Sequence, residues 1–111
     1  MQRHFTSQRQ SDVFTKWLRA LRDRRARVIV IDRVARLARL ARFGVGDTKR
    51  IGARVEELRI PFGPGYRIYF TVVSDEVVFL LVGGDKGSQT RDIVLAQRLA
   101  ADAHDIANDP I

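Results

Sequence analysis

The chain has 111 residues, which is enough for one domain with a hydrophobic core and too few for two. With 45% hydrophobic and 30% charged residues, its composition indicates a globular protein rather than a disordered one. The formal net charge of +7 favours polyanions or acidic proteins as partners, although a well-solvated surface would have the same charge excess.

The residue content argues against metal and disulfide chemistry. There is no cysteine, and the two histidines, His4 and His104, are too few for a histidine-based metal centre. No apolar signal segment follows Met1, and no run of about 18 apolar residues could cross a bilayer. We therefore expect a cytoplasmic protein without metal, cofactor or membrane partner.

The N-terminal part predicts a weak strand followed by two helices. Residues 3–9 alternate weakly and could form an edge strand. Ser11 and Asp12 offer N-cap chemistry for a first helix, and Asp23 offers it for a second helix over about 24–42. Because the turn between them is short, we expect an antiparallel helical hairpin. The expected core residues are Val13, Phe14, Trp17, Leu18 and Leu21 in the first helix, and Val30, Val34, Leu37 and Ala41 in the second.

The two helices are rich in arginine, which permits two interpretations. One is a surface that contacts phosphates or an acidic partner; the other is a solvated helix face, because arginine is a good helix former. A loop over residues 43–52 then leads into the sheet. The candidate RNA-binding residues are Arg33, Arg36, Lys49, Arg50 and Arg91.

The middle of the chain predicts three antiparallel strands, over residues 55–60, 66–72 and 77–82. The first two flank a tight Gly63-Pro64-Gly65 turn. If Ser74 and Asp75 form the next turn, Arg67 lies opposite Val82. A third helix then covers about 90–103, with Ile93, Ala96, Leu99, Ala100 and Ala103 as its apolar face, and residues 104–111 form a frayed tail.

The predicted fold is therefore α+β: an N-terminal helical hairpin packed on a small antiparallel sheet of three to four strands, with a C-terminal helix. If all helices pack on one sheet face, the other face stays partly open. That face carries Glu57, Arg59, Arg67 and Tyr69, with Lys86 at its rim.

This open face could bind and cleave RNA. Guanidinium groups bind phosphate in a planar two-point geometry, so Arg59 and Arg67 could stabilise attack of a ribose 2′-hydroxyl on its neighbouring phosphate. Glu57, Tyr69 and Lys86 are the candidates for proton transfer. The alternatives are structural: Glu57 could pair with the arginines across strands, and Tyr69 could cover the sheet.

Two acidic residues outside this face have simpler roles. The positions of Asp85 and Asp92 in the sequence favour roles as loop and helix N-terminal caps over acid catalysis.

Several motifs in order resemble those of the HigB-like addiction-module killer proteins of the RelE/ParE toxin superfamily. They are Trp17-Leu18, Gly46-Asp47-x-Lys49, Glu57-Leu58-Arg59-Ile60, Gly63 to Phe70, and Gly83-Gly84-Asp85-Lys86-x-x-Gln89-x-x-Asp92-Ile93. The resemblance covers about residues 10–103 of a single 1–111 domain. It departs from the ribonucleases of the superfamily at Glu57, where they carry a lysine, and near Asp92, where they carry a tyrosine.

The resemblance implies a toxin of a type II toxin–antitoxin module, neutralised by a small helix-turn-helix antitoxin from the same operon. It also implies a ribosome-dependent, metal-independent mRNA endoribonuclease, in which Arg59, Arg67 and Lys86 hold the scissile phosphate. The alternatives are a ParE-like toxin that poisons DNA gyrase without nuclease activity, and a degenerate module that binds nucleic acid or regulates its own operon.

Overall fold

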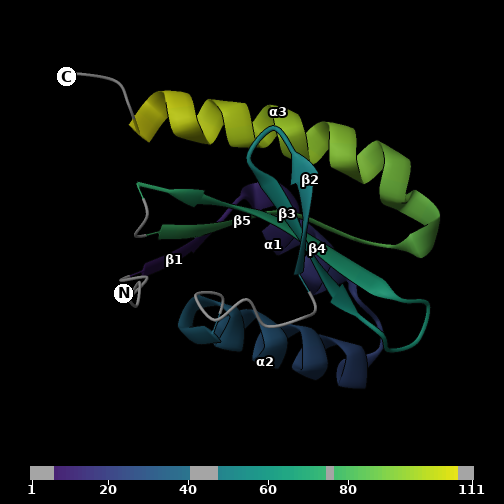
Figure 1. Cartoon of the computed structure of the whole chain (residues 1–111). Helices are drawn as coiled ribbons and strands as arrows, with labels where there is room; N and C mark the ends of the chain where they lie inside the picture. The colour runs from purple at the N-terminus through teal and green to yellow at the C-terminus, as the bar shows by residue number, and fades with distance from the viewer. Residues whose placement is uncertain (1–6, 41–47, 75–76, 108–111) are drawn as a thin grey trace.

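A computed structural model describes residues 7–40, 48–74 and 77–107 of the chain. The fold is α+β, as predicted, and its central layer is one five-stranded sheet (Figure 1). In chain order the elements are β1 (Ser7–Gln10), α1 (Asp12–Ala20), α2 (Arg24–Leu40), β2 (Thr48–Gly52), β3 (Val55–Ile60), β4 (Tyr66–Val73), β5 (Val77–Asp85), a short 3-10 helix η2 (Lys86–Ser88) and α3 (Gln89–Ala107).

The sheet is larger than predicted and mixed rather than antiparallel. Its strand order is β1-β5-β4-β3-β2, with β1 parallel to β5 and the other neighbours antiparallel. The edge strand predicted over residues 3–9 corresponds in part to β1, which covers Ser7–Gln10, and residues 3–6 lie outside the described residues. The additional strand, β2, was expected to be loop because its polar residues give no alternating pattern. An edge strand of this kind is held by backbone hydrogen bonds to one neighbour and needs no apolar face.

The predicted register between β4 and β5 was wrong. Val73 pairs with Val77, which a two-residue loop at Ser74 and Asp75 does not allow, and Arg67 lies opposite Gly84 rather than Val82. A β-bulge at Leu81 in β5 adds a further offset, because the adjacent residues Tyr69 and Phe70 pair with Val82 and Leu80.

The bulge is stabilised by the junction between β1 and α1. The Ser11 backbone N–H donates to the Leu80 carbonyl at 2.9 Å, and its hydroxyl donates to the Leu81 carbonyl. The same hydroxyl oxygen accepts the Phe14 N–H at 3.0 Å, as predicted for the N-cap of α1. Ser11 therefore connects β1, the start of α1 and the bulge in β5.

The sheet is covered on both faces, which contradicts the expected open face. The helices α1 and α2 contribute Phe14, Ala26, Val30, Val34 and Leu37 to a core on one face. The third helix packs Ala96 and Ala100 on the other face, against Val55, Tyr69, Leu81 and Val82. In Figure 1 the sheet lies between α3 and α2.

The two N-terminal helices do not form the predicted hairpin pair. The backbone of α1 lies against β5 rather than against α2. The predicted cap of α2 is confirmed, because the Asp23 carboxylate accepts the N–H groups of Arg25 and Ala26. The side chains of both helices nevertheless share one core on the sheet. Ala41, expected in the buried stripe of α2, lies outside the described residues.

The end of α3 also differs from the expectation of a frayed tail over residues 104–111, of which residues 108–111 lie outside the described residues. The helix continues to Ala107, and the His104 Nε2 lies 2.8 Å from the Thr71 hydroxyl. Thr71 is buried and donates to the Arg54 carbonyl at 2.7 Å. Since that bond uses the hydroxyl proton, His104 donates to Thr71. This contact holds the last turns of α3 on the sheet.

Within the described ranges, no helix is both long enough and apolar enough to span a membrane.

Candidate functional site

The candidate site is a polar cluster centred on Glu57, on the sheet face that α3 covers. The Glu57 side chain is fully buried. Its Oε1 accepts from Arg59 Nε at 2.7 Å and from Arg67 Nη1 at 3.0 Å, while its Oε2 accepts from Gln89 Nε2 at 3.2 Å. Arg59 and Arg67 are cross-strand neighbours on β3 and β4, so one carboxylate oxygen bridges two guanidinium groups.

The two arginines differ in exposure. The Arg59 side chain is 50% exposed, whereas that of Arg67 is 14% exposed. Among the described residues, buried side-chain atoms without a hydrogen-bond partner are Arg67 Nε and the Tyr69 hydroxyl. Buried polar groups are normally paired, so both atoms mark a site that is not organised for stability alone.

The environment keeps Glu57 ionised. Burial opposes ionisation, but the hydrogen bond from Arg59, the charges of Arg67 and Arg59, and Gln89 outweigh it, so the pKa of Glu57 lies below its ordinary value. An ionised carboxylate has no proton to donate at neutral pH. Its geometry supports the structural alternative, in which Glu57 pairs with the arginines across strands.

Tyr69 has the opposite perturbation. Burial raises the pKa of its hydroxyl, and the negative charges of Glu57 and Asp92 raise it further. The phenol is therefore neutral at physiological pH and cannot serve as a base in this state. Its ring packs in the core under α3, so the alternative reading of Tyr69 as a residue that covers the sheet is also supported.

The two glycines at the end of β5 let large groups approach the sheet from both sides. A Cβ at Gly83 would overlap the indole ring of Trp17, on the face covered by α1. A Cβ at Gly84 would overlap the Asp92 carboxylate and crowd the Ser88 hydroxyl, on the face covered by α3. Asp92 is 6% exposed and accepts a hydrogen bond from Ser88. Gly84 therefore allows the first turn of α3 to lie directly on β5.

Lys86 lies where the sequence predicted, beside the Gly63-Pro64-Gly65 turn. Gly63 and Gly65 adopt positive φ angles of 57° and 81°. A Cβ at Gly65 would be 4.0 Å from the Lys86 Cβ, so the two loops meet at one corner of the sheet. Lys86 is exposed and follows Asp85, whose carboxylate caps η2, the capping role predicted for it. Asp92, also expected to cap, lies instead within the first turn of α3.

The five predicted RNA-binding residues do not form one surface. Lys49 on β2 lies opposite Glu57 in the register, next to the cluster, and Arg50 follows it on the same strand. Arg91 is largely exposed in the first turn of α3, with its Nε 3.9 Å from Asp92 Oδ1. Arg33 and Arg36 lie on α2, across the sheet from the cluster (Figure 1).

Sequence reasoning assigned no role to Ser88 or Gln89 and treated Asp92 as a cap. These residues supply the α3 side of the cluster. The Gly83-Gly84 pair is the sequence pattern that could have indicated their position, because glycine at the end of an apolar strand indicates close approach of another segment. Within the described part of the chain, no group of three or more histidine and acidic side chains is placed to hold a metal ion.

Comparison with known proteins agrees with this architecture. Residues 16–106 match the profile of the family described as phage derived protein Gp49-like (DUF891). An uncharacterized protein of Haemophilus influenzae strain Rd is 41% identical over 88 residues, which cover 78% of this chain and 85% of that protein.

Two solved structures from Escherichia coli have a similar fold. A double-arginine mutant of the toxin RelE in the free state superposes with a TM-score of 0.68 at 16% identity, covering 89% of this chain and 98% of that one. The intact RelBE toxin–antitoxin complex gives a TM-score of 0.60 at 17% identity, covering 72% and 95%. The profile match extends over most of the sequence, and the chain is therefore a member of the Gp49-like family, with a fold like that of RelE.

Proposed function

We propose that the chain is the toxin of a type II toxin–antitoxin module and cleaves mRNA on the ribosome without a metal ion. The observation that carries this proposal is the pairing of Arg59 and Arg67 with the buried Glu57 carboxylate, near the end of the sheet where Lys86 lies beside the Gly63-Pro64-Gly65 turn. The fold similarity to RelE and to the RelBE complex supports a toxin with an antitoxin partner. A HigB-like subtype within this class is part of the same proposal.

The cations would bind the scissile phosphodiester. Arg59 and Lys86 are accessible, whereas Arg67 is largely buried and has an unpaired Nε. A phosphate that meets two guanidinium groups and an ammonium is stabilised most when charge builds up on its oxygens, as in attack by the ribose 2′-hydroxyl.

Substrate binding would also change Glu57. A phosphate that draws Arg59 and Arg67 away from Oε1 removes the interactions that depress the pKa of Glu57, so the carboxylate becomes a better base. Its Oε2 is held by the longest of the three hydrogen bonds, from Gln89. In this scheme Glu57 accepts the 2′-hydroxyl proton and Lys86 donates a proton to the departing 5′-oxygen.

The test is growth arrest on expression without antitoxin, together with mapping of mRNA 5′ ends by primer extension. We expect Arg67→Ala and Lys86→Ala each to abolish arrest and cleavage. Arg98→Ala, which removes an exposed arginine from α3 outside the cluster, is the matched control and should remain toxic. Circular dichroism would verify that each variant folds, and Lys86→Ala, at an exposed position, tests the site even if Arg67→Ala is unstable.

Two other results would support the alternative functions. If Arg67→Ala and Lys86→Ala still arrest growth and cause DNA damage, the protein acts as a gyrase poison. If the unaltered protein does not slow growth, the chain is a degenerate module that binds nucleic acid or regulates its operon.

A further inference from the structure

The helix α2 is apolar over a wider arc than the sheet buries. Val30, Val34 and Leu37 are in the core, but Val28 and Ile31 are 66% and 53% exposed. At 100° per residue, Val28, Ile31 and Ala35 lie within about 60° of one another on the helix surface. An isolated exposed valine is ordinary, whereas a continuous apolar stripe indicates an interaction surface.

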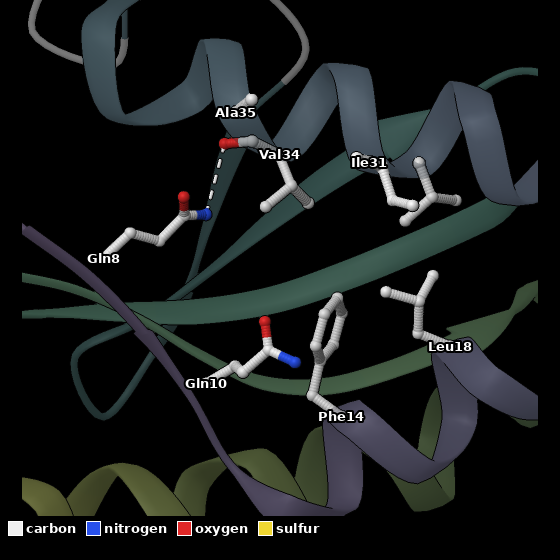
Figure 2. Close-up of a pocket in the computed structure, with 8 residues that line it drawn as sticks. Gln8, Gln10, Phe14, Leu18, Ile31, Val34 and Ala35 are labelled. Atoms are coloured by element: carbon white, nitrogen blue, oxygen red, sulfur yellow. Dashed lines mark hydrogen bonds between the residues drawn. The ribbon is translucent and has the colours of Figure 1, made fainter.

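A hollow of about 210 Å³ lies beside this stripe, between α2, α1 and β1 (Figure 2). In Figure 2, Phe14 and Leu18 point from α1 toward α2, and the Gln8 amide donates to the Val34 carbonyl. Gln10 also has a partner, because its amide donates to the Thr15 hydroxyl at 2.7 Å. The lining is Gln8, Gln10, Phe14, Leu18, Val30, Ile31, Val34 and Ala35. With both amides engaged, the hollow is suited to apolar side chains.

A second hollow of about 320 Å³ lies toward the start of α2, lined by Arg24, Arg25, Val28 and Ile29. Ile31 lines the first hollow and Val28 lines the second, and the two residues are about one helical turn apart, so the hollows follow one another along α2. The resulting groove offers apolar side chains from both hollows and is basic at its N-terminal end, where the first turn of α2 has no acidic residue and the preceding Asp23 carboxylate accepts backbone N–H groups of the helix.

The apolar hollows and the basic end of the groove together indicate which kind of ligand fits it. A second copy of the chain would bring two arginine-rich faces together, and each copy has a net charge of +7. An RNA backbone would pair with the arginines but leave the apolar hollows unfilled. A membrane surface is flat, whereas discrete hollows fit individual side chains.

We propose that this groove binds an acidic amphipathic helix of a partner protein. Its apolar side chains, spaced three or four residues apart, fill the two hollows, and its carboxylates face Arg24 and Arg25. The groove lies on the side of the sheet that α1 and α2 cover, whereas Glu57 lies on the side that α3 covers, so the groove is separate from the Glu57 cluster (Figure 1). The identity of the partner as the antitoxin rests on the proposed function; the binding itself does not.

The test is fluorescence anisotropy of the full chain with a designed, labelled helical peptide that has a leucine stripe flanked by glutamates. We expect saturable binding that Val28→Asp and Ile31→Asp each weaken at least about tenfold, as for loss of an interface anchor. Val94→Asp is the matched control, because Val94 on α3 is 65% exposed and outside the groove. Peptides with serines for the leucines, or lysines for the glutamates, should not bind.

Several results would overturn the proposal. One is equal binding by the groove variants and the unaltered chain, and another is equal binding of the lysine peptide. Analytical ultracentrifugation that shows a dimer dissociated by Ile31→Asp would assign the groove to a second copy. Sedimentation with anionic phosphatidylserine vesicles, lost in Val28→Asp, would assign it to a membrane.

The same peptide assay separates this inference from the proposed function. The Arg67→Ala protein should bind the peptide as the unaltered chain does. Peptide binding without mRNA cleavage would defeat the ribonuclease proposal alone, and cleavage without peptide binding would defeat the groove proposal alone.

Discussion

The two faces of the sheet differ in the polarity of the side chains that they bury. The face under α1 and α2 is a continuous apolar core, in which Phe14, Val30 and Ile68 are almost fully buried. The face under α3 is apolar toward Ala96 and Ala100, but near the start of the helix it buries Glu57 and Asp92. One sheet therefore supports a packing core on one side and a charged cluster on the other.

This difference between the faces indicates which residues determine folding and which are available for function. An apolar core gains free energy from burial regardless of partner identity, whereas a buried carboxylate requires specific partners from other segments. Glu57 finds them on β3, β4 and α3. Not every polar atom around Glu57 has a hydrogen-bond partner, because Arg67 Nε and the Tyr69 hydroxyl are buried and unpaired.

The largest expected effect comes from breaking the apolar face. Phe14 is 1% exposed and contacts Trp17 with ring centroids 5.7 Å apart. Phe14→Ala should lower the free energy of unfolding by about 3–5 kcal/mol, because it removes buried surface and leaves a cavity. Urea denaturation would measure the loss. Val94→Ala, at an exposed site, should change stability by less than about 0.5 kcal/mol; a similar loss in both variants would contradict the assignment of the core.

An intermediate effect is expected where α3 meets the charged end of β5. Gly84→Ala should destabilise the fold by about 2 kcal/mol, because the new Cβ overlaps the Asp92 carboxylate. The double variant Gly84→Ala/Asp92→Ala should recover part of this loss in a double-mutant cycle. Strictly additive losses would show that Asp92 does not pack on Gly84.

The smallest effect concerns the charge of Glu57. Because its folded pKa lies below the unfolded value, ionised Glu57 contributes stability above the ordinary carboxyl range, and this contribution is lost as pH falls through the lowered pKa. Glu57→Gln should cost on the order of 1 kcal/mol at pH 7, because the amide still accepts one hydrogen bond from the arginines.

Urea denaturation across a pH series would measure this contribution. The difference in stability between the unaltered chain and Glu57→Gln should shrink as the pH falls below the ordinary Glu pKa of 4.5, because Glu57 then protonates in the unfolded chain before it does so in the folded one. A difference that stays constant with pH would show that the carboxylate is not the group responsible.

Periodicity in the sequence predicted the elements whose burial is one-sided. The alternation of Tyr66, Ile68 and Phe70 placed these residues in the core under α1 and α2, and the capping residues Ser11 and Asp23 were identified correctly. It also placed Glu57, Arg59, Arg67 and Tyr69 on one common face. These are local properties, because side-chain direction follows from backbone geometry within each element.

The covering of that face was not predictable in the same way. The apolar residues of α3 have helical spacing, but spacing does not say which side of a sheet the helix occupies. The register error at Arg67 has two sources, the pairing of Val73 with Val77 and a bulge opposite Tyr69, and a bulge leaves no sequence pattern of its own. Strand β2 was missed because Lys49 and Arg50 look like loop residues.

The sequence by itself determined the α+β class, the glycine turns and the set of charged residues that share one face. The tertiary structure decided that α3 lies over this face, that Gln89 reaches Glu57 Oε2, and that Gly84 makes room for Asp92. The physical reason is the range of the interactions: caps, turns and alternation act within a few residues, whereas the Glu57 carboxylate is satisfied by groups as far as 32 positions away in the chain.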